Sequence, residues 1–425
     1  MKQRSNRLQR WFRARIALLG VCVCGMAMIV VVRAFHLQVA SGDELREMAE
    51  DQHLRQLRVS PRRGAIYDRH GAELAVSADV DSVYANPRRL KAMDQNPRAV
   101  AHRLARILDV DAARLATRLS SDRYFVWIKR RVTPLEATRV RELDVPGIEL
   151  TTEARRYYPN RHLAAHLIGF ADIDGRGIEG VELAFEDRLR GSARRVEAIR
   201  DRRGQVVFAD DMEDDRTMQG QNVVLTIDKA IQHVAERELA LGVRTFEARG
   251  GSVVVMDPST GELLALANYP PFNPNEPSKH PIAHRRNRAV VDRFEPGSTV
   301  KPFTMAAALA AGAVKPNQSI NCENGVAKIA GRRLHDAHPY EWLTPTQVLA
   351  HSSNIGTAKI ALDLGKKRLY RSFRRFGFGE VTSLGVPGET AGILRHYRRW
   401  YEIDTATVSF GQGMSVTNVQ LATAM

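Results

Sequence analysis

The chain has 425 residues, enough for two or three domains, and 44% of them are hydrophobic and 26% charged. This balance is typical of a globular protein and excludes a largely disordered one. The net charge of +15 is compatible with nucleic acid, anionic lipid or an acidic polymer as partner. Only Cys322 lies outside an apolar N-terminal segment, which excludes a disulfide framework in the rest of the chain.

The N-terminus has the pattern of a membrane anchor. Residues 1–15 carry six basic and no acidic residues, and the next 17 residues are uncharged. A single transmembrane helix over 16–35 is predicted, with residues 1–15 in the cytoplasm. A cleaved signal peptide is the alternative, but Arg33 and His36 interrupt the region where a cleavage site should follow. The rest of the chain is then extracytoplasmic, which argues against nucleic acid as partner.

Residues 36–215 are expected to form a mixed, arginine-rich pedestal or interaction domain. A helix is predicted over 42–54 from the capping-box spacing of Ser41 and Glu44. Two further helices, opened by Asn-Pro and Thr-Pro pairs, are predicted to end near Leu108 and Leu143. Four strands are predicted, at 57–60, 64–67, 73–76 and 82–85, and a charged linker at 210–215.

A second domain is expected over 220–425, so that the whole chain is α+β. Strands are predicted at 222–227, 250–256 and 263–267, the last two as a hairpin, with a helix from Asp228 to about Arg244. Because both hairpin strands are apolar on each face, we expect a central antiparallel sheet covered by helices. Further helices are predicted over 303–311, from Thr344 to about His351, from there to about Leu364, and from Thr417 onward.

The pair Ser298 and Lys301 is the candidate for chemistry. A Pro-Gly turn precedes Ser298, and an apolar helix follows Lys301. Residues three apart share one helix face, so the two side chains should lie close together. A lysine that burial keeps neutral can take the proton of a serine, which makes the serine a nucleophile for acyl transfer. The tetrapeptide alone is a weak motif; its setting is what favours catalysis.

Ser352 and Asn354 form a second candidate pair, on the turn between two predicted helices. The hydroxyl of Ser352 could relay a proton, and the amide of Asn354 could hold a substrate amide. An ordinary helix cap is the competing interpretation. His351 and Cys322 are interpreted as structural, and no metal or cofactor is expected.

In these residues the chain closely resembles the class B penicillin-binding proteins, the D,D-transpeptidases that cross-link bacterial peptidoglycan. The first two family motifs correspond to Ser298-Thr-Val-Lys301 and Ser352-Ser-Asn354. Other family-like runs follow in the family's order along the chain: Arg63-Gly-Ala-Ile-Tyr-Asp-Arg-His-Gly71, Arg156-Tyr-Tyr-Pro159, His166-Leu-Ile-Gly-Phe170, Gly177-Ile-Glu-Gly180, Leu225-Thr-Ile-Asp228, Met256-Asp-Pro-Ser-Thr-Gly261, Tyr269-Pro-Pro-Phe-Asn273, Phe376-Gly-Phe-Gly379 and Phe410-Gly-Gln-Gly413.

The resemblance implies roles for the candidate residues. Ser298 would be acylated by the penultimate D-Ala of a D-Ala-D-Ala stem peptide, and Lys301 would accept its proton. Ser352 and Asn354 would relay protons and orient the donor peptide. β-Lactams would acylate Ser298. The sequence looks more like the division-septum branch, which implies a septal glycan polymerase and other divisome proteins as partners.

One family motif is missing, because no K-T-G or K-S-G run occurs in the 425 residues. The sequence is therefore interpreted as truncated before that motif, with its transpeptidase domain incomplete and its own activity in doubt. Two alternatives stay open: a non-catalytic membrane-anchored divisome scaffold, and a relative that hydrolyses or senses β-lactams. The long pedestal argues against the hydrolase.

Overall fold

The computed structural model describes residues 25–33, 35, 54–59, 62–191, 194–200, 206–207 and 219–425. The predicted tail (1–15) and linker (210–215) lie outside these residues, as do half of the predicted helix over 16–35 and all but the last residue of the one over 42–54. Residues 25–33 are helical. In the described ranges, no helix combines the length and the apolar composition needed to cross a membrane, so the predicted span stays a prediction.

The chain divides into two compact units. The smaller one contains a three-stranded antiparallel sheet in the order β1–β6–β7, formed by β1 (Leu54–Val59), β6 (Arg194–Arg200) and β7 (Val206–Val207). The larger unit comprises residues 61–192 and 219–425 and contains every candidate site residue. The predicted domain boundaries stay a prediction.

A mixed sheet forms the first half of the larger unit. Its strands are β2 (Ile66–Tyr67), β3 (Glu73–Ala85), β4 (Val126–Lys129), β5 (Ile148–Tyr157) and β8 (Val223–Val224). The order is β4–β3–β2–β8, and β5 pairs with β3. The two strands predicted at 73–76 and 82–85 are one strand, because β5 pairs with β3 without interruption from Val76 to Ala85. The polar residues between them had hidden this continuity.

Helices cover this sheet at its β3–β4 end. They are α3 (Pro87–Ala92), α4 (Pro97–Leu108), α5 (Ala112–Leu119) and α6 (Pro134–Glu142). The predictions for α4 and α6 are confirmed, with Asn96 capping α4 and a capping box from Thr133 opening α6. Leu90, Leu104 and Leu108 are fully buried in the core between the helices and the sheet.

A buried ion network joins two of the family-like runs to the short helices that follow β5. The short helices α7 (Ala165–Ile168), α8 (Gly180–Ala184) and α9 (Glu186–Leu189) follow β5. The fully buried carboxylate of Glu182 accepts hydrogen bonds from Arg63 Nε at 2.5 Å, Arg156 Nε at 2.6 Å and Tyr158 Oη at 3.1 Å. Glu186 pairs with Arg63 at 2.6 Å. These residues hold β2, β5 and α8 together.

The hairpin of the second half is confirmed. Strands β9 (Gly251–Met256) and β10 (Leu263–Tyr269) pair in antiparallel register, and α11 (Lys229–Thr245), capped by Asp228, packs on them. On their other side lie α13 (Arg288–Val291) and α19 (Asn418–Ala424). The hairpin is therefore covered by helices, as expected. The strand predicted over 222–227 is only the two residues of β8.

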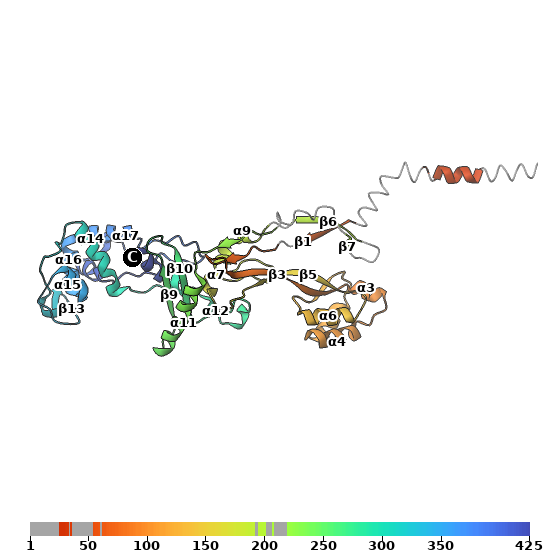
Figure 1. Ribbon diagram of the computed structural model, residues 1–425, viewed down its shortest axis with the longest axis horizontal. Coiled ribbons are helices and arrows are strands. Elements are labelled where there is room, and N and C mark those ends of the chain that lie inside the picture. Colours follow the sequence, from red (N-terminus) through yellow and green to blue (C-terminus); the bar gives the residue numbers. More distant parts are fainter. Residues whose placement is uncertain are drawn as a thin grey trace, which may run out of the picture. The chain divides into compact units, whose positions relative to one another are not determined.

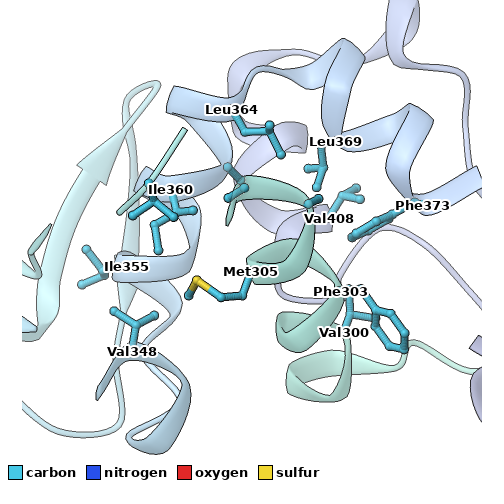
Figure 2. Packing of buried hydrophobic residues seen from close by; sticks show 14 of the residues in the cluster. Val300, Phe303, Met305, Val348, Ile355, Ile360, Leu364, Leu369, Phe373 and Val408 are labelled. Carbon is cyan, nitrogen blue, oxygen red and sulfur yellow. The ribbon is translucent and has the colours of Figure 1, made fainter. Parts of the chain in front are cut away.

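The remaining helices form a lobe around α14 (Lys301–Ala310), as Figure 1 shows. They are α15 (Pro345–Ala350), α16 (Asn354–Leu364), α17 (Lys366–Arg375) and α18 (Glu402–Ser409). In Figure 2, Met305 points toward α16, while Phe303 lies on the other side of α14, where its ring contacts those of Phe376 at 5.0 Å and Phe378 at 5.1 Å. The buried apolar face of α14 thus fixes the direction in which its first residues point.

Short elements connect these helices. They are η3 (Pro277–Lys279), α12 (Ile282–Arg285), η4 (Gly297–Val300), β11 (Ile320–Asn321), η5 (Glu323–Gly325), β12 (Val326–Ile329), β13 (Arg332–His335), β14 (Trp342–Leu343) and η6 (Tyr397–Arg399). The antiparallel β12–β13 pair contacts both α16 and α18. Cys322 is fully buried next to β11, in keeping with its interpretation as a packed residue.

Candidate active site

Ser298 lies on a single 3-10 turn, η4, which leads directly into α14. The apolar residues Val300 and Phe303 anchor this junction in the core, whereas Ser298 itself is exposed. Lys301 is the first residue of α14 and is only 2% exposed. Ser298 and Lys301 therefore lie at the start of the helix as predicted, but Ser298 is on the 3-10 turn before it. The serine faces solvent, and the lysine three residues later is buried.

The glycine loop after α18 supports the serine turn. Gly297 donates its backbone N–H to the carbonyl of Gly411 at 3.1 Å, and Gly413 donates to the Glu295 carboxylate at 2.8 Å. A Cβ atom on Gly411 would collide with the backbone of Gly297. Gly411 also has φ +84°, in the left-handed region that favours glycine. The Phe410-Gly-Gln-Gly413 run, weak as a sequence motif, thus shapes the serine turn.

Ser352 connects Ser298 to Lys301. Its Oγ lies 3.0 Å from Ser298 Oγ and 2.9 Å from Lys301 Nζ. Lys301 Nζ also donates to the backbone carbonyl of Ser352. Ser352 adopts φ +52°, a conformation that is strained for a residue with a side chain and that is common at active sites. Three of the four candidate residues therefore form one hydrogen-bonded chain.

Burial shifts the proton equilibrium of Lys301. Desolvation lowers the pKa of its ammonium from 10.5 to about 8, and the negative charge of Asp336 opposes this shift. At pH 7 about one lysine in ten is then the free amine, compared with about one in three thousand for an unperturbed side chain. The site can therefore supply a base close to neutral pH.

Asn354 is the first residue of α16 and is held by its backbone and its side chain. The side-chain amide donates to the carbonyl of His335 at 3.0 Å. The carboxylate of Asp336 accepts from the backbone N–H groups of Asn354 at 2.5 Å and Ile355 at 3.0 Å. Asn354 lies on the turn of the site but is not in the Ser298–Ser352–Lys301 chain.

Comparison with known proteins gives one consistent result. Residues 251–425 match the model of the penicillin binding protein transpeptidase domain, and residues 58–225 match that of the penicillin-binding protein dimerisation domain. A probable peptidoglycan D,D-transpeptidase PenA from Neisseria gonorrhoeae is 38% identical over 96% of this chain and 70% of the relative. Peptidoglycan D,D-transpeptidase FtsI from Escherichia coli is 39% identical over 96% of this chain and 69% of the relative.

The chain belongs to the class B penicillin-binding proteins. It is thus a member of the division-type peptidoglycan D,D-transpeptidases, which are serine enzymes, and the predicted family, reaction class and α+β two-domain fold are confirmed. Stage V sporulation protein D from Bacillus subtilis is also similar, at 31% identity over 97% of this chain and 64% of the relative. A crystal structure of a peptidoglycan synthetase from Bifidobacterium adolescentis has a TM-score of 0.64 and 28% identity, covering 87% of this chain and 72% of that one.

Sequence reasoning missed two residues of this penicillin-binding protein site. Ser353 is buried, caps α16 through Gly356 N–H, and donates to Asp336 at 2.5 Å. Asp336 therefore holds three donors of the turn that carries Ser352 and Asn354. The cap at Ser353 could have been read from its place before α16. Asp336 could not, because it comes from the end of a distant hairpin.

Proposed function

We propose that this chain cross-links D-Ala-D-Ala stem peptides of peptidoglycan at the division septum, with Ser298 as the acylated nucleophile. The observation that carries this proposal is the chain of contacts from Ser298 through Ser352 to Lys301, with 3.0 and 2.9 Å between its side-chain atoms. The relatives named as peptidoglycan D,D-transpeptidases support the substrate class. β-Lactams, as substrate mimics, would acylate the same hydroxyl.

In the acylation step, the Ser298 hydroxyl attacks the carbonyl carbon of the penultimate D-Ala. Its proton passes to the free amine of Lys301, either directly or through the Ser352 hydroxyl. The peptide bond then breaks, and its nitrogen takes a proton from the Lys301 ammonium as the terminal D-Ala leaves. Ser298 is left as an ester of the donor peptide.

In the second step, an amine of a neighbouring stem peptide attacks this ester. The amine loses a proton to Lys301, and the Ser298 oxygen regains a proton through Ser352 as the cross-link forms. Asn354 orients the donor peptide, since the bond to His335 fixes the plane of its amide, whose oxygen would accept from the peptide.

The placement of the chain in the cell is part of the proposal. Residues 16–35 would cross the inner membrane once, residues 1–15 would be cytoplasmic, and the pedestal (36–215) and transpeptidase (220–425) domains would be periplasmic. Six basic residues followed by an uncharged run support this orientation. A septal glycan polymerase and other divisome proteins would be the partners. Cleavage of the extracytoplasmic part by protease added to spheroplasts, with the tail protected, would test it.

Labelling with a fluorescent penicillin tests the nucleophile. Membranes that carry the chain should show a covalent band that disappears in Ser298→Ala and persists in Thr299→Ala, which removes the neighbouring hydroxyl on the same turn. A band that persists in Ser298→Ala would refute the assignment. Should Ser298→Ala support division as well as the unsubstituted chain, the alternative of a non-catalytic membrane-anchored divisome scaffold would replace the enzymatic role.

A further inference from the structure

The helix α17 and the short turn η6 together form a strongly cationic surface. α17 has six basic residues and no acidic one in ten positions, and η6 adds two arginines. The ring of Tyr370 packs against His396 at 5.0 Å and Tyr397 at 5.6 Å, which joins the two elements. We define the α17–η6 surface by six exposed basic residues, leaving out Lys366, which donates to the carbonyl of Trp400: Lys367, Arg368, Arg371, Arg375, Arg398 and Arg399.

Neighbouring acidic groups do not neutralise this surface. Arg374 pairs with Glu380 and Arg395 with Asp404, but both arginines lie outside the set defined above. Within the described ranges, none of the six side chains of the α17–η6 surface takes part in an ion pair or a hydrogen bond. All six charges are therefore available to an external partner.

The spacing of these charges is unfavourable for the free helix. Lys367, Arg371 and Arg375 follow one another at intervals of four, so like charges are direct neighbours on one stripe. A solvent-exposed helix face normally carries basic and acidic residues side by side, which avoids this repulsion. An anionic partner would remove this repulsion, so the spacing of the charges favours its binding.

The chemistry of the surface indicates what kind of anion it suits. Guanidinium groups bind carboxylates through paired hydrogen bonds, and the exposed ring of Tyr401, 79% exposed directly after Trp400, offers an aromatic face to the C–H groups of a sugar. The apolar residues of α17, Leu369 and Phe373, are fully buried. The helix therefore lacks the exposed aliphatic side chains with which an interfacial helix enters a bilayer.

We propose that the α17–η6 surface binds the free carboxylates of stem peptides along a glycan strand, as a contact with peptidoglycan separate from the Ser298 site. The choice of this polymer rests on the proposed function, but the binding does not depend on chemistry at Ser298. α17 is about 15 Å long, so several carboxylates of one strand can reach it together. Single exposed ion pairs are weak, and a repeating ligand makes their sum effective.

Co-sedimentation with purified peptidoglycan sacculi tests the proposal, with the full 425-residue chain in detergent. The test variant carries Lys367→Gln, Arg371→Gln, Arg375→Gln and Arg398→Gln. The control variant removes four exposed arginines of the pedestal helices, which form no ion pair with any described residue, and so changes the net charge equally: Arg98→Gln, Arg106→Gln, Arg114→Gln and Arg139→Gln. Thermal unfolding of both variants checks that they fold.

The test variant should bind sacculi about tenfold more weakly than the control variant, and added salt should weaken binding of the unsubstituted chain. The two variants should bind equally to sacculi whose carboxylates are amidated. On sacculi stripped of attached phosphate-bearing polymers, the test variant should still bind more weakly than the control variant. Equal binding of the two variants would overturn the proposal. It would also be overturned if the difference appeared only on vesicles of phosphatidylglycerol. Penicillin labelling of the same samples reports Ser298 separately, so failure of one proposal is distinguishable from failure of the other.

Discussion

Replacing Asp336 by asparagine should affect both the geometry and the proton equilibrium of the active site. Its carboxylate accepts from Ser353 Oγ, Asn354 N and Ile355 N, at 2.5, 2.5 and 3.0 Å. An asparagine can keep both backbone contacts through its carbonyl oxygen and donate its amide to Ser353. The negative charge, which strengthens each of these contacts by about 1 kcal/mol, is then lost. Because Asp336 is partly exposed, solvent weakens this effect, and we expect the free energy of unfolding to fall by about 2 kcal/mol.

The same substitution changes the pKa of Lys301, the proposed base. The negative charge of Asp336 is what partly offsets the effect of burial on Lys301, so its loss should lower the Lys301 pKa below about 8. A lower pKa means that the free amine forms at lower pH. The pH at which acylation is half maximal should therefore shift downward, while the maximal rate falls because the Ser352 turn is held less firmly.

The assay is the second-order rate constant of acylation by a fluorescent penicillin, measured across pH for the unsubstituted chain and Asp336→Asn. Asp363→Asn is the control, since Asp363 is exposed further along α16 and should leave both the rate and the midpoint unchanged. A normal maximal rate with an unchanged midpoint in Asp336→Asn would refute the role assigned to this carboxylate.

Three further predictions concern other parts of the larger unit. Because burial lowers the pKa of Lys301 to about 8, acylation should rise with pH through that value and level off above it; a rate constant that does not change there would exclude Lys301 as the base. Gly411→Ala should slow acylation at least about tenfold by displacing the serine turn, whereas Gly377→Ala, with a similar positive φ but open space around it, should not. Glu182→Gln should lower the free energy of unfolding by about 3 kcal/mol, since two buried arginines lose their carboxylate; equal thermal unfolding temperatures would contradict this.

Local patterns predicted much of the fold. The helices α4, α6, α11 and α15 begin where Asn, Thr or Asp caps stand in the sequence, because a cap depends only on neighbouring residues. The hairpin β9–β10 was visible from two apolar runs around a turn. The continuity of β3 was not, since Ser77 and Asp79 are polar and pair with Arg156 and Ala154 of β5, which come much later in the chain.

In the active site, too, the sequence predicted the local features but not the long-range contacts. Ser298 and Lys301 could be paired from their spacing, and Ser352 with Asn354 from their place between helices. That Ser352 bridges the other two, rather than merely lying nearby, depends on the packing of α16 against α14, which is a long-range feature. For the same reason Asp336 escaped sequence reasoning, and the contact of the Phe410–Gly413 run with the serine turn was not predicted: each reaches the site from a segment whose position only the folded chain defines.

The buried Glu182 network has a consequence for the order of folding. Arg63 is 119 residues ahead of its carboxylate, and β2 pairs in parallel with β8 at Val223. During synthesis, β2 can pair at once with β3, but Arg63 has no carboxylate and the other edge of β2 has no partner until more than a hundred further residues have been made. Closing so long a loop is slow, and an unpaired strand invites wrong partners in the meantime. The pedestal is thus expected to be completed late in synthesis, when the chain that forms the catalytic half is already emerging.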